Sequence, residues 1–249
     1  MTDYTVNSDS SYSIIILKNS EELSKAFCSA LKLAVVSNKD KYFNIALSGG
    51  STPKEIFRIL SSEYKDTIDW KKVQLFWGDE RCVPPENSES NYGIAKQLLI
   101  DNVGLPEQNV FRIKGEEEPS GESIRYADII RENVKTENGL PAFDLTMLGV
   151  GEDGHTASIF PNQTNLLNSD KICATAVHPE SNQIRVTITG NVINNSKRII
   201  FLVSGKSKSE ILKRIFRDKN SSSLPAENIV AKNGTLHWYI DQDAALLLK

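Results

Sequence analysis

Short apolar runs alternate along this chain with stretches of helical periodicity. The runs lie within predicted strands of four to six residues that are rich in β-branched or aromatic side chains, at residues 14–17, 44–47, 73–77, 143–148, 184–188, 198–203 and 236–240. Between such runs, apolar residues recur at every third or fourth position, as Leu23, Phe27 and Leu31 do, which is typical of a helix with one buried face. Continuous apolar strands joined through helices form mostly parallel sheets with helices on both faces. The sequence therefore predicts an open α/β fold, and because no polar loop is long enough to be a linker, we expect a single domain over residues 1–249.

Local patterns predict where several helices begin. Ser/Thr-x-x-Glu patterns at residues 52–55 and 207–210 fit capping boxes, in which a hydroxyl and a carboxylate bond the free N–H groups of a helix start. A further helix is expected over residues 123–134, preceded by a polar loop at residues 116–121. A short helix is expected after residue 240.

Composition narrows the classes of function. The 29 Lys and Arg residues against 32 Asp and Glu residues give a formal net charge of −3, which argues against a protein that binds nucleic acid through bulk positive charge. The longest apolar runs have five residues, whereas a membrane-spanning helix needs about 20, so we expect no membrane association. The first residues lack the basic start and apolar core of a signal peptide, and the three cysteines are scattered without a CxxC pair. We therefore expect a cytoplasmic protein without a disulfide framework, a structural zinc site or an obligate protein partner.

Four loops that follow strands carry residues suited to chemistry, and in open α/β sheets ligands bind at the carboxyl ends of the strands. The first holds Gly49, Gly50 and Ser51, where the glycines let a ligand approach the backbone and the following helix start offers N–H groups to an anion. A tight strand-to-helix turn explains this segment equally well. The second loop holds Asp79 and Arg81, and Arg81 could clamp a phosphate or carboxylate. Taken alone, that loop fits a solvated surface better.

The third loop, after residues 143–148, reads GVGEDGHT. Its glycines have the GxGxxG spacing of dinucleotide-binding proteins, but Pro161 interrupts the long helix that such a site requires, so nicotinamide binding is disfavoured. What remains is His155 beside Asp153. A neutral imidazole can accept a proton, and a nearby carboxylate can fix its tautomer. A histidine that merely caps the turn is the alternative.

The fourth loop, at residues 204–208, carries Lys206 and Lys208. Basic residues at a helix start oppose the helix dipole, so their placement favours an anionic ligand over a simple solvated helix end. The chain has no GxSxG elbow, no HExxH pair and no P-loop, which disfavours the usual serine hydrolases, zinc catalysis and nucleoside triphosphate chemistry. One histidine, one carboxylate and several anion-binding groups suit attack of water on a phosphorylated, activated carbonyl compound. That reaction needs no metal and no organic cofactor.

Several of these segments resemble the 6-phosphogluconolactonase family. The resemblance rests on ALSGGSTPKEIF, FWGDERCVPPENSESNYGIA, FDLTMLGVGEDGHTASIFP and FLVSGKSKSEIL, and with weaker segments it extends from Ala46 to Ala245. It implies hydrolysis of 6-phosphogluconolactone to 6-phosphogluconate, a step of the oxidative pentose phosphate pathway, on a small-molecule sugar-phosphate lactone. It also implies a fold shared with glucosamine-6-phosphate deaminases and ribose-5-phosphate isomerases.

Two other functions stay open at this point. A glucosamine-6-phosphate deaminase would share the fold, although such enzymes typically show DEY and GHIAFNEP-like segments where this chain has DER and GHTASIFP. A non-catalytic sugar-phosphate sensor would share the ligand. Release of ammonia, or binding without turnover, distinguishes these from a lactonase.

The resemblance also implies roles for individual residues. His155 corresponds to the general base that activates water, with Asp153 as its neighbour. Basic positions expected to hold the phosphate or polarise the ring-opening oxygens are Arg81, Arg185 and Lys208, with Lys206 as an alternative to Lys208. The sugar-phosphate pocket is expected to be lined by Gly49, Gly50 and Ser51, and Asp79 is expected to order Arg81.

Overall fold

The computed structural model describes residues 3–5, 12–218 and 224–248. Its main sheet has seven strands in the order β1-β2-β12-β11-β8-β3-β4. All neighbouring pairs are parallel except β1 with β2. The strands are β1 (Asp3–Thr5), β2 (Ser13–Leu17), β3 (Phe43–Leu47), β4 (Val73–Trp77), β8 (Leu145–Leu148), β11 (Arg198–Val203) and β12 (Thr235–Asp241). The expected open, mostly parallel α/β sheet is therefore confirmed.

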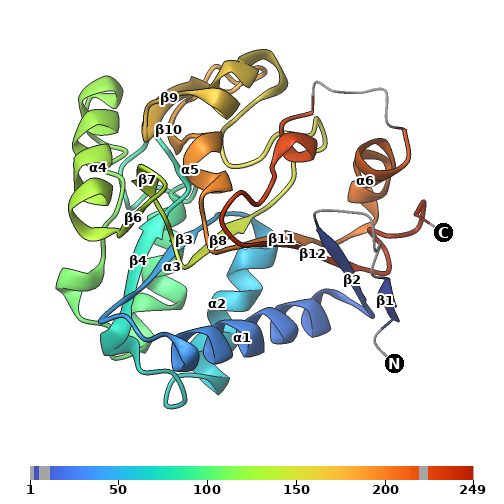
Figure 1. Cartoon of the computed structure of the whole chain (residues 1–249), viewed down its shortest axis with the longest axis horizontal. Coiled ribbons are helices and arrows are strands. Elements are labelled where there is room, and N and C mark those ends of the chain that lie inside the picture. Colours follow the sequence, from blue (N-terminus) through green and yellow to red (C-terminus); the bar gives the residue numbers. More distant parts are fainter. Residues whose placement is uncertain (1–2, 6–11, 219–223, 249) are drawn as a thin grey trace.

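Helices cover both faces of this sheet. They are α1 (Ser20–Ser37), α2 (Ser51–Glu63), α3 (Asn91–Leu98), α4 (Pro119–Asn133), α5 (Gly190–Asn194) and α6 (Ser209–Phe216). Short 3₁₀ turns lie at Trp70–Lys72, Ile100–Asn102, Glu107–Asn109, Pro161–Asn168, Lys206–Lys208 and Pro225–Asn228. In Figure 1, α1 and α2 lie below the main sheet, whereas α4, α5 and α6 lie above it. Among the described residues, no helix is both long enough and apolar enough to cross a membrane.

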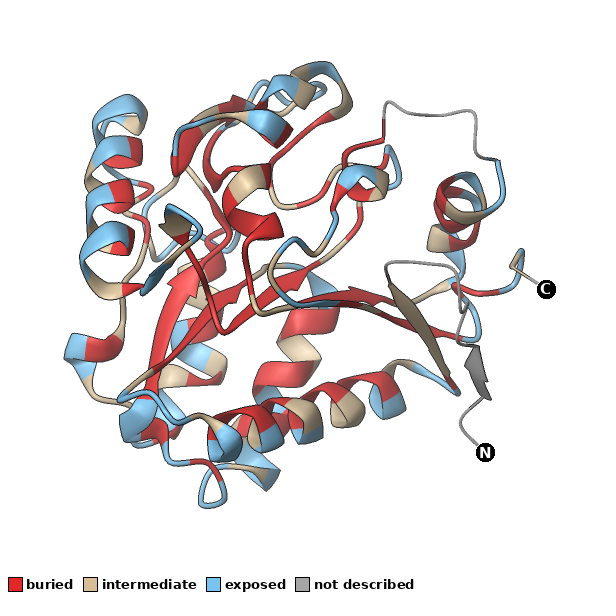
Figure 2. Ribbon diagram, in the orientation of Figure 1, coloured by how far each residue is buried: buried red, intermediate tan, exposed pale blue. Residues whose placement is uncertain are grey.

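The core follows from the periodicities seen in the sequence. Every residue of β3 and β4 is buried, as expected for strands covered on both faces. Helix α1 turns Leu23, Phe27 and Leu31 inward, and the side chain of Asn19 caps its start by accepting a hydrogen bond from Glu22 N. Figure 2 shows buried strands through the middle of the molecule and exposed residues on the outer sides of α1 and α4.

A second, antiparallel sheet was not expected. Its order is β5-β10-β9, with β5 at Asp79–Arg81, β9 at Cys173–Val177 and β10 at Ile184–Ile188. Residues 184–188 are thus a strand as predicted, but not one of the parallel sheet. A separate two-stranded sheet pairs β6 (Thr136–Glu137) with β7 (Leu140–Pro141). The second sheet matters for function because β5 directly continues β4, so that a strand end of the main sheet becomes part of another layer.

Both predicted capping boxes are wrong. Helix α2 begins at Ser51 with Gly50 as its cap, and Thr52 Oγ1 instead bonds Ser204 Oγ at 2.9 Å, a tertiary contact between two loops. Helix α6 begins at Ser209, because residues 206–208 form a 3₁₀ turn first.

Two further boundaries differ from expectation. Helix α4 begins at Pro119, because the carboxylate of Glu118 accepts hydrogen bonds from Ser120 N and Gly121 N and caps it there. The chain after β12 forms turns at residues 242–247 and no helix.

Candidate active site

A cavity of about 200 Å³ lies where β3, β8 and β11 end and β4 passes into β5. Its lining brings together seven of the residues singled out from the sequence: Gly49, Gly50, Asp79, Arg81, His155, Arg185 and Lys208. Ser51, Asp153 and Lys206 are not in the lining. Segments that are far apart in the chain therefore meet at one edge of the main sheet, as strand-end loops of an open α/β sheet do.

His155 and Asp153 form a hydrogen-bonded pair. His155 Nδ1 lies 2.7 Å from Asp153 Oδ1, and the same oxygen accepts a hydrogen bond from His155 N. Burial alone would raise the pKa of Asp153, but its hydrogen bonds and attraction to His155 outweigh this and lower that pKa to about 2. Asp153 is therefore a carboxylate at neutral pH, and it favours the tautomer in which Nδ1 carries the proton and Nε2 is the basic nitrogen.

Glycines make this turn possible. Gly154 has φ +89°, a conformation that favours glycine, and a Cβ there would lie 2.7 Å from Leu224 Cδ2. A Cβ on Gly151 would lie 2.1 Å from His155 Nδ1. The imidazole thus packs directly against the backbone of Gly151, and the GxGxxG spacing serves the histidine turn.

Arg81 and Arg185 lie directly opposite one another on β5 and β10. The Arg185 side chain is buried, with its guanidinium 5.6 Å from the centre of the Phe160 ring. Burial lowers the pKa of Arg185, Arg81 lowers it further, and Asp79 opposes the change. Like charges facing each other across a ladder destabilise it, so this pair favours an anion in the cavity.

The acids beside Arg81 are held firmly. Asp79 Oδ2 accepts a hydrogen bond of 2.6 Å from Ser158 Oγ. Glu80 is buried, and its carboxylate accepts hydrogen bonds from the backbone N–H groups of residues 81, 91 and 92 and from Ser90 Oγ. Burial raises the pKa of Glu80 while these backbone bonds oppose the rise. Glu80 therefore fastens the start of α3 to β5.

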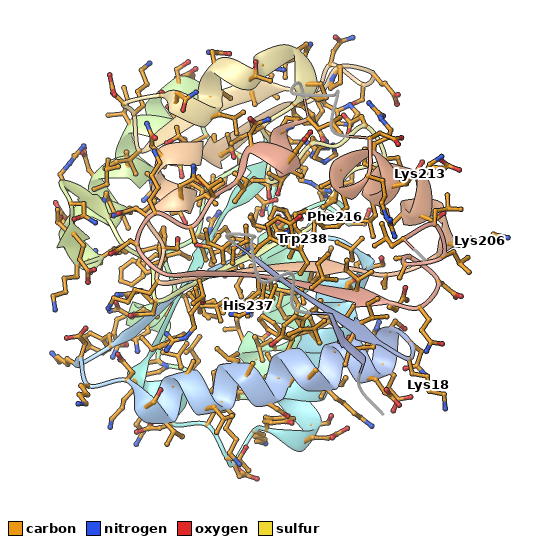
Figure 3. The ribbon with its side chains drawn as sticks, turned by 45° about the vertical axis from the view of Figure 1, so that its right-hand side comes forward. Lys18, Lys206, Lys213, Phe216, His237 and Trp238 are labelled. Carbon is orange, nitrogen blue, oxygen red and sulfur yellow. The ribbon has the colours of Figure 1, made fainter. Side chains whose placement is uncertain are left out.

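The side chains of Lys206 and Lys208, in the fourth loop, point to different places. Lys208 lines the cavity, whereas Lys206 extends outward into solvent in Figure 3. The loop is anchored by Asp241, whose carboxylate oxygens accept hydrogen bonds from Gly205 N at 3.0 and 3.1 Å. This geometry favours Lys208 as the residue that meets a ligand.

Sequence reasoning missed some residues near the cavity. Asn91 lines it from the first position of α3. The ring centre of His178 lies 6.5 Å from that of His155 and 5.2 Å from that of Phe160, because the β9–β10 hairpin places it there. Local sequence pattern singles out neither residue, because contacts with the second sheet place both of them near the cavity.

A larger cavity of about 910 Å³ lies between α4, the β6–β7 hairpin and β9. Its lining contains none of the site residues predicted from the sequence. The smaller cavity is the better candidate because it alone of the two holds the histidine and the paired arginines. Within the described part of the chain, no three His, Cys, Asp or Glu side chains form a group that could hold a metal ion.

Comparisons with known proteins agree with this geometry. Residues 18–238 match the family of glucosamine-6-phosphate isomerases and 6-phosphogluconolactonases. The chain is 43% identical over 221 residues to the 6-phosphogluconolactonase of Haemophilus influenzae, covering 88% of this chain and 93% of the relative.

Solved structures agree as well. A structure named devB protein has a TM-score of 0.90 at 40% identity and covers 95% of this chain and 99% of its own. The 6-phosphogluconolactonase from Trypanosoma cruzi has a TM-score of 0.83 at 26% identity, with coverages of 95% and 96%. A monomeric glucosamine-6-phosphate deaminase, with a TM-score of 0.77 at 20% identity and coverages of 94% and 99%, shares the fold. The chain belongs to the glucosamine-6-phosphate isomerase/6-phosphogluconolactonase family.

Proposed function

We propose that this protein is a 6-phosphogluconolactonase, which hydrolyses 6-phosphogluconolactone to 6-phosphogluconate with His155 as general base. The observation that carries the proposal is that His155, hydrogen-bonded to Asp153, lines the same cavity as Arg81 and Arg185. A base and a set of anion-binding groups are what hydrolysis of a phosphorylated lactone requires. The named relatives that share 40% or more of their residues over most of the chain support the substrate class.

The substrate's phosphate binds first in this scheme. Arg81, Arg185 and Lys208 neutralise its charge, and the backbone of Gly49 and Gly50 allows the sugar phosphate to approach closely. Binding the phosphate holds the lactone carbonyl in a defined position relative to His155. The water that His155 activates then meets the carbonyl carbon in the right geometry, which lowers the barrier to attack.

Proton transfer then passes through one imidazole. His155 Nε2 takes a proton from water as its oxygen attacks the lactone carbonyl carbon. Asp153 stabilises the imidazolium that forms, because its carboxylate already bonds Nδ1. The imidazolium returns the proton to the ring oxygen as the C–O bond breaks, so the histidine is restored. General acid–base catalysis of this kind contributes about 10²–10⁴-fold.

A direct assay tests the proposal. Freshly prepared 6-phosphogluconolactone is hydrolysed with and without protein, and acid release is followed with a pH indicator after subtraction of spontaneous hydrolysis. His155→Ala is expected to lower kcat by about 100-fold or more while the circular dichroism spectrum stays unchanged. Wild-type kcat in a folded His155→Ala variant refutes the mechanism. Ammonia release from glucosamine-6-phosphate without lactone hydrolysis, or binding of 6-phosphogluconate without turnover of the lactone, refutes the function.

A further inference from the structure

Asn91 joins two walls of the cavity that come from different sheets. It is the first residue of α3 and is 2% exposed. Its side-chain Nδ2 donates a hydrogen bond of 3.0 Å to the backbone oxygen of Asp79, on β5. Its side chain also packs against Gly49, on the loop that follows β3: a Cβ built on Gly49 would lie 1.8 Å from Asn91 Oδ1 and 2.4 Å from Asn91 Cγ.

The orientation of this amide is fixed by chemistry. A backbone carbonyl oxygen can only accept a hydrogen bond, so the NH₂ group must face Asp79 and the oxygen must face Gly49. That oxygen is buried and has no hydrogen-bond partner among the described residues. A buried acceptor without a donor costs free energy, so packing alone would not favour an amide at this position.

The amide stands where the two walls diverge. Gly78 N donates a hydrogen bond to Leu47 O at 2.8 Å, which is the last bond that joins β3 and β4. Beyond this bond, β3 continues into the loop that carries Gly49 and Gly50, here called the glycine loop, and β4 continues into β5 with Arg81. The Asn91 amide lies between these two segments, since it bonds Asp79 of β5 and packs against Gly49 of the glycine loop.

Hydrogen bonds to Glu80 hold Asn91 and the start of α3 in place against β5. Glu80 Oε1 accepts a hydrogen bond of 2.8 Å from Asn91 N, and Glu80 Oε2 accepts one of 2.7 Å from Tyr92 N. The same carboxylate accepts a hydrogen bond from Arg81 N. The spacing from Arg81 through Glu80 and Asn91 to Gly49 is therefore set by one continuous chain of contacts.

We propose that Asn91 is a positioning residue that sets the distance between the glycine loop and the arginine-bearing strand. It acts on ligand affinity through Gly49, which must be glycine because the amide occupies the place of its side chain. The inference deepens the proposed function and rests on it, since the ligand at these two walls is taken to be the phosphorylated lactone.

A double-mutant cycle tests the proposal. Gly49→Ala places a methyl group against the amide, and Asn91→Ala removes the amide and leaves room for that methyl group. Asn91→Ala alone is expected to raise KM for the lactone about tenfold with kcat within about threefold, because it loosens the binding geometry and leaves the base untouched. Gly49→Ala alone is expected to raise KM by about 100-fold, whereas the double variant is expected to recover at least about tenfold of that loss.

Matched controls separate this from general damage. Asn102→Ala removes an exposed amide beyond α3 that bonds Gln97 O, and Gly104→Ala adds a Cβ that meets nothing within 4 Å. Both are expected to leave KM unchanged. Circular dichroism and thermal unfolding establish that each variant is folded.

Each outcome decides a different question. Effects of the two substitutions that simply multiply, or an unchanged KM in folded Asn91→Ala, overturn the positioning role. If the wild type does not hydrolyse the lactone, the proposed function fails. The same cycle is then measured by calorimetry with 6-phosphogluconate, where rescue of affinity in the double variant still supports the role and its absence overturns it. If Gly49→Ala does not fold, the Asn91→Ala result decides alone.

Discussion

Gly151→Ala is expected to disable the histidine pair without removing either of its members. The new Cβ would lie 2.1 Å from His155 Nδ1 and 2.5 Å from Asp153 Oδ1, whereas Cβ atoms essentially never come closer than 3.0 Å to a heavy atom of a residue that is not adjacent in the chain. Nδ1 must therefore retreat by about 0.9 Å and the carboxylate oxygen by about 0.5 Å. Misplacing a catalytic group by about 1 Å can cost about 100-fold in rate, so we expect kcat to fall by about that factor.

The assay is lactone hydrolysis at saturating substrate, corrected for the spontaneous reaction. Backbone strain is not expected, because Gly151 is not among the glycines with a positive φ. The His155 side chain is 24% exposed and can move outward, so thermal unfolding should change little. Gly104→Ala is the control for a glycine-to-alanine change in open space. A Gly151→Ala protein with kcat within threefold of wild type would show that the geometry of the pair does not limit the reaction.

Three other changes give distinct signatures. Lys208→Ala is expected to raise KM about tenfold or more while Lys206→Ala leaves it unchanged, because only Lys208 lines the cavity; equal effects of the two changes in steady-state kinetics would contradict this. The pKa of Asp153 in the folded protein lies below its ordinary value of 3.8, so its contribution to stability is present above about pH 4 and is lost as pH falls toward 2. The free energy of unfolding, measured with urea, should therefore fall less between about pH 4 and about pH 2 in Asp153→Asn than in wild type. Parallel plots of that free energy against pH for the two proteins would contradict this. Tyr126→Phe removes a buried hydroxyl that accepts a hydrogen bond from Trp77 N and donates one to Trp77 O, and it is expected to cost about 1–3 kcal/mol in urea unfolding; a loss below about 0.5 kcal/mol would contradict that.

The parallel sheet was predictable because its strands carry their own signal. Strands β3 and β4 are buried along their whole length, so they are continuous apolar runs in the sequence. Strand β5 has no such signal. It is the three charged residues Asp79–Arg81, and it forms a strand only because β10 lies beside it. Local pattern cannot report a pairing partner that lies about a hundred residues away.

The site residues that could be predicted are likewise those that lie close together in the sequence. His155, its glycines and its carboxylate lie within one short segment, so sequence spacing was enough to single them out. The predicted capping box at residues 52–55 failed for the opposite reason, since Thr52 bonds Ser204 of another loop instead of its own helix, a contact that local spacing does not indicate. Asn91 was missed because its importance comes from Asp79 and Gly49, neither of which is its neighbour in the sequence.

The facing arginines have a consequence for how this protein tolerates change. Arg185 meets Arg81 because each is the direct partner of the other in the antiparallel ladder of β5 and β10. Slipping one strand by a single residue turns every side chain to the opposite face. Such a slip would keep the composition, the net charge and every hydrogen-bonding group of both strands, and would still take one arginine out of the cavity. Attraction for an anion therefore depends on the register between β5 and β10. The turn at residues 178–183 joins β9 to β10, so a one-residue deletion there shifts β10 relative to its neighbours and should weaken binding more than replacing several exposed residues of the turn.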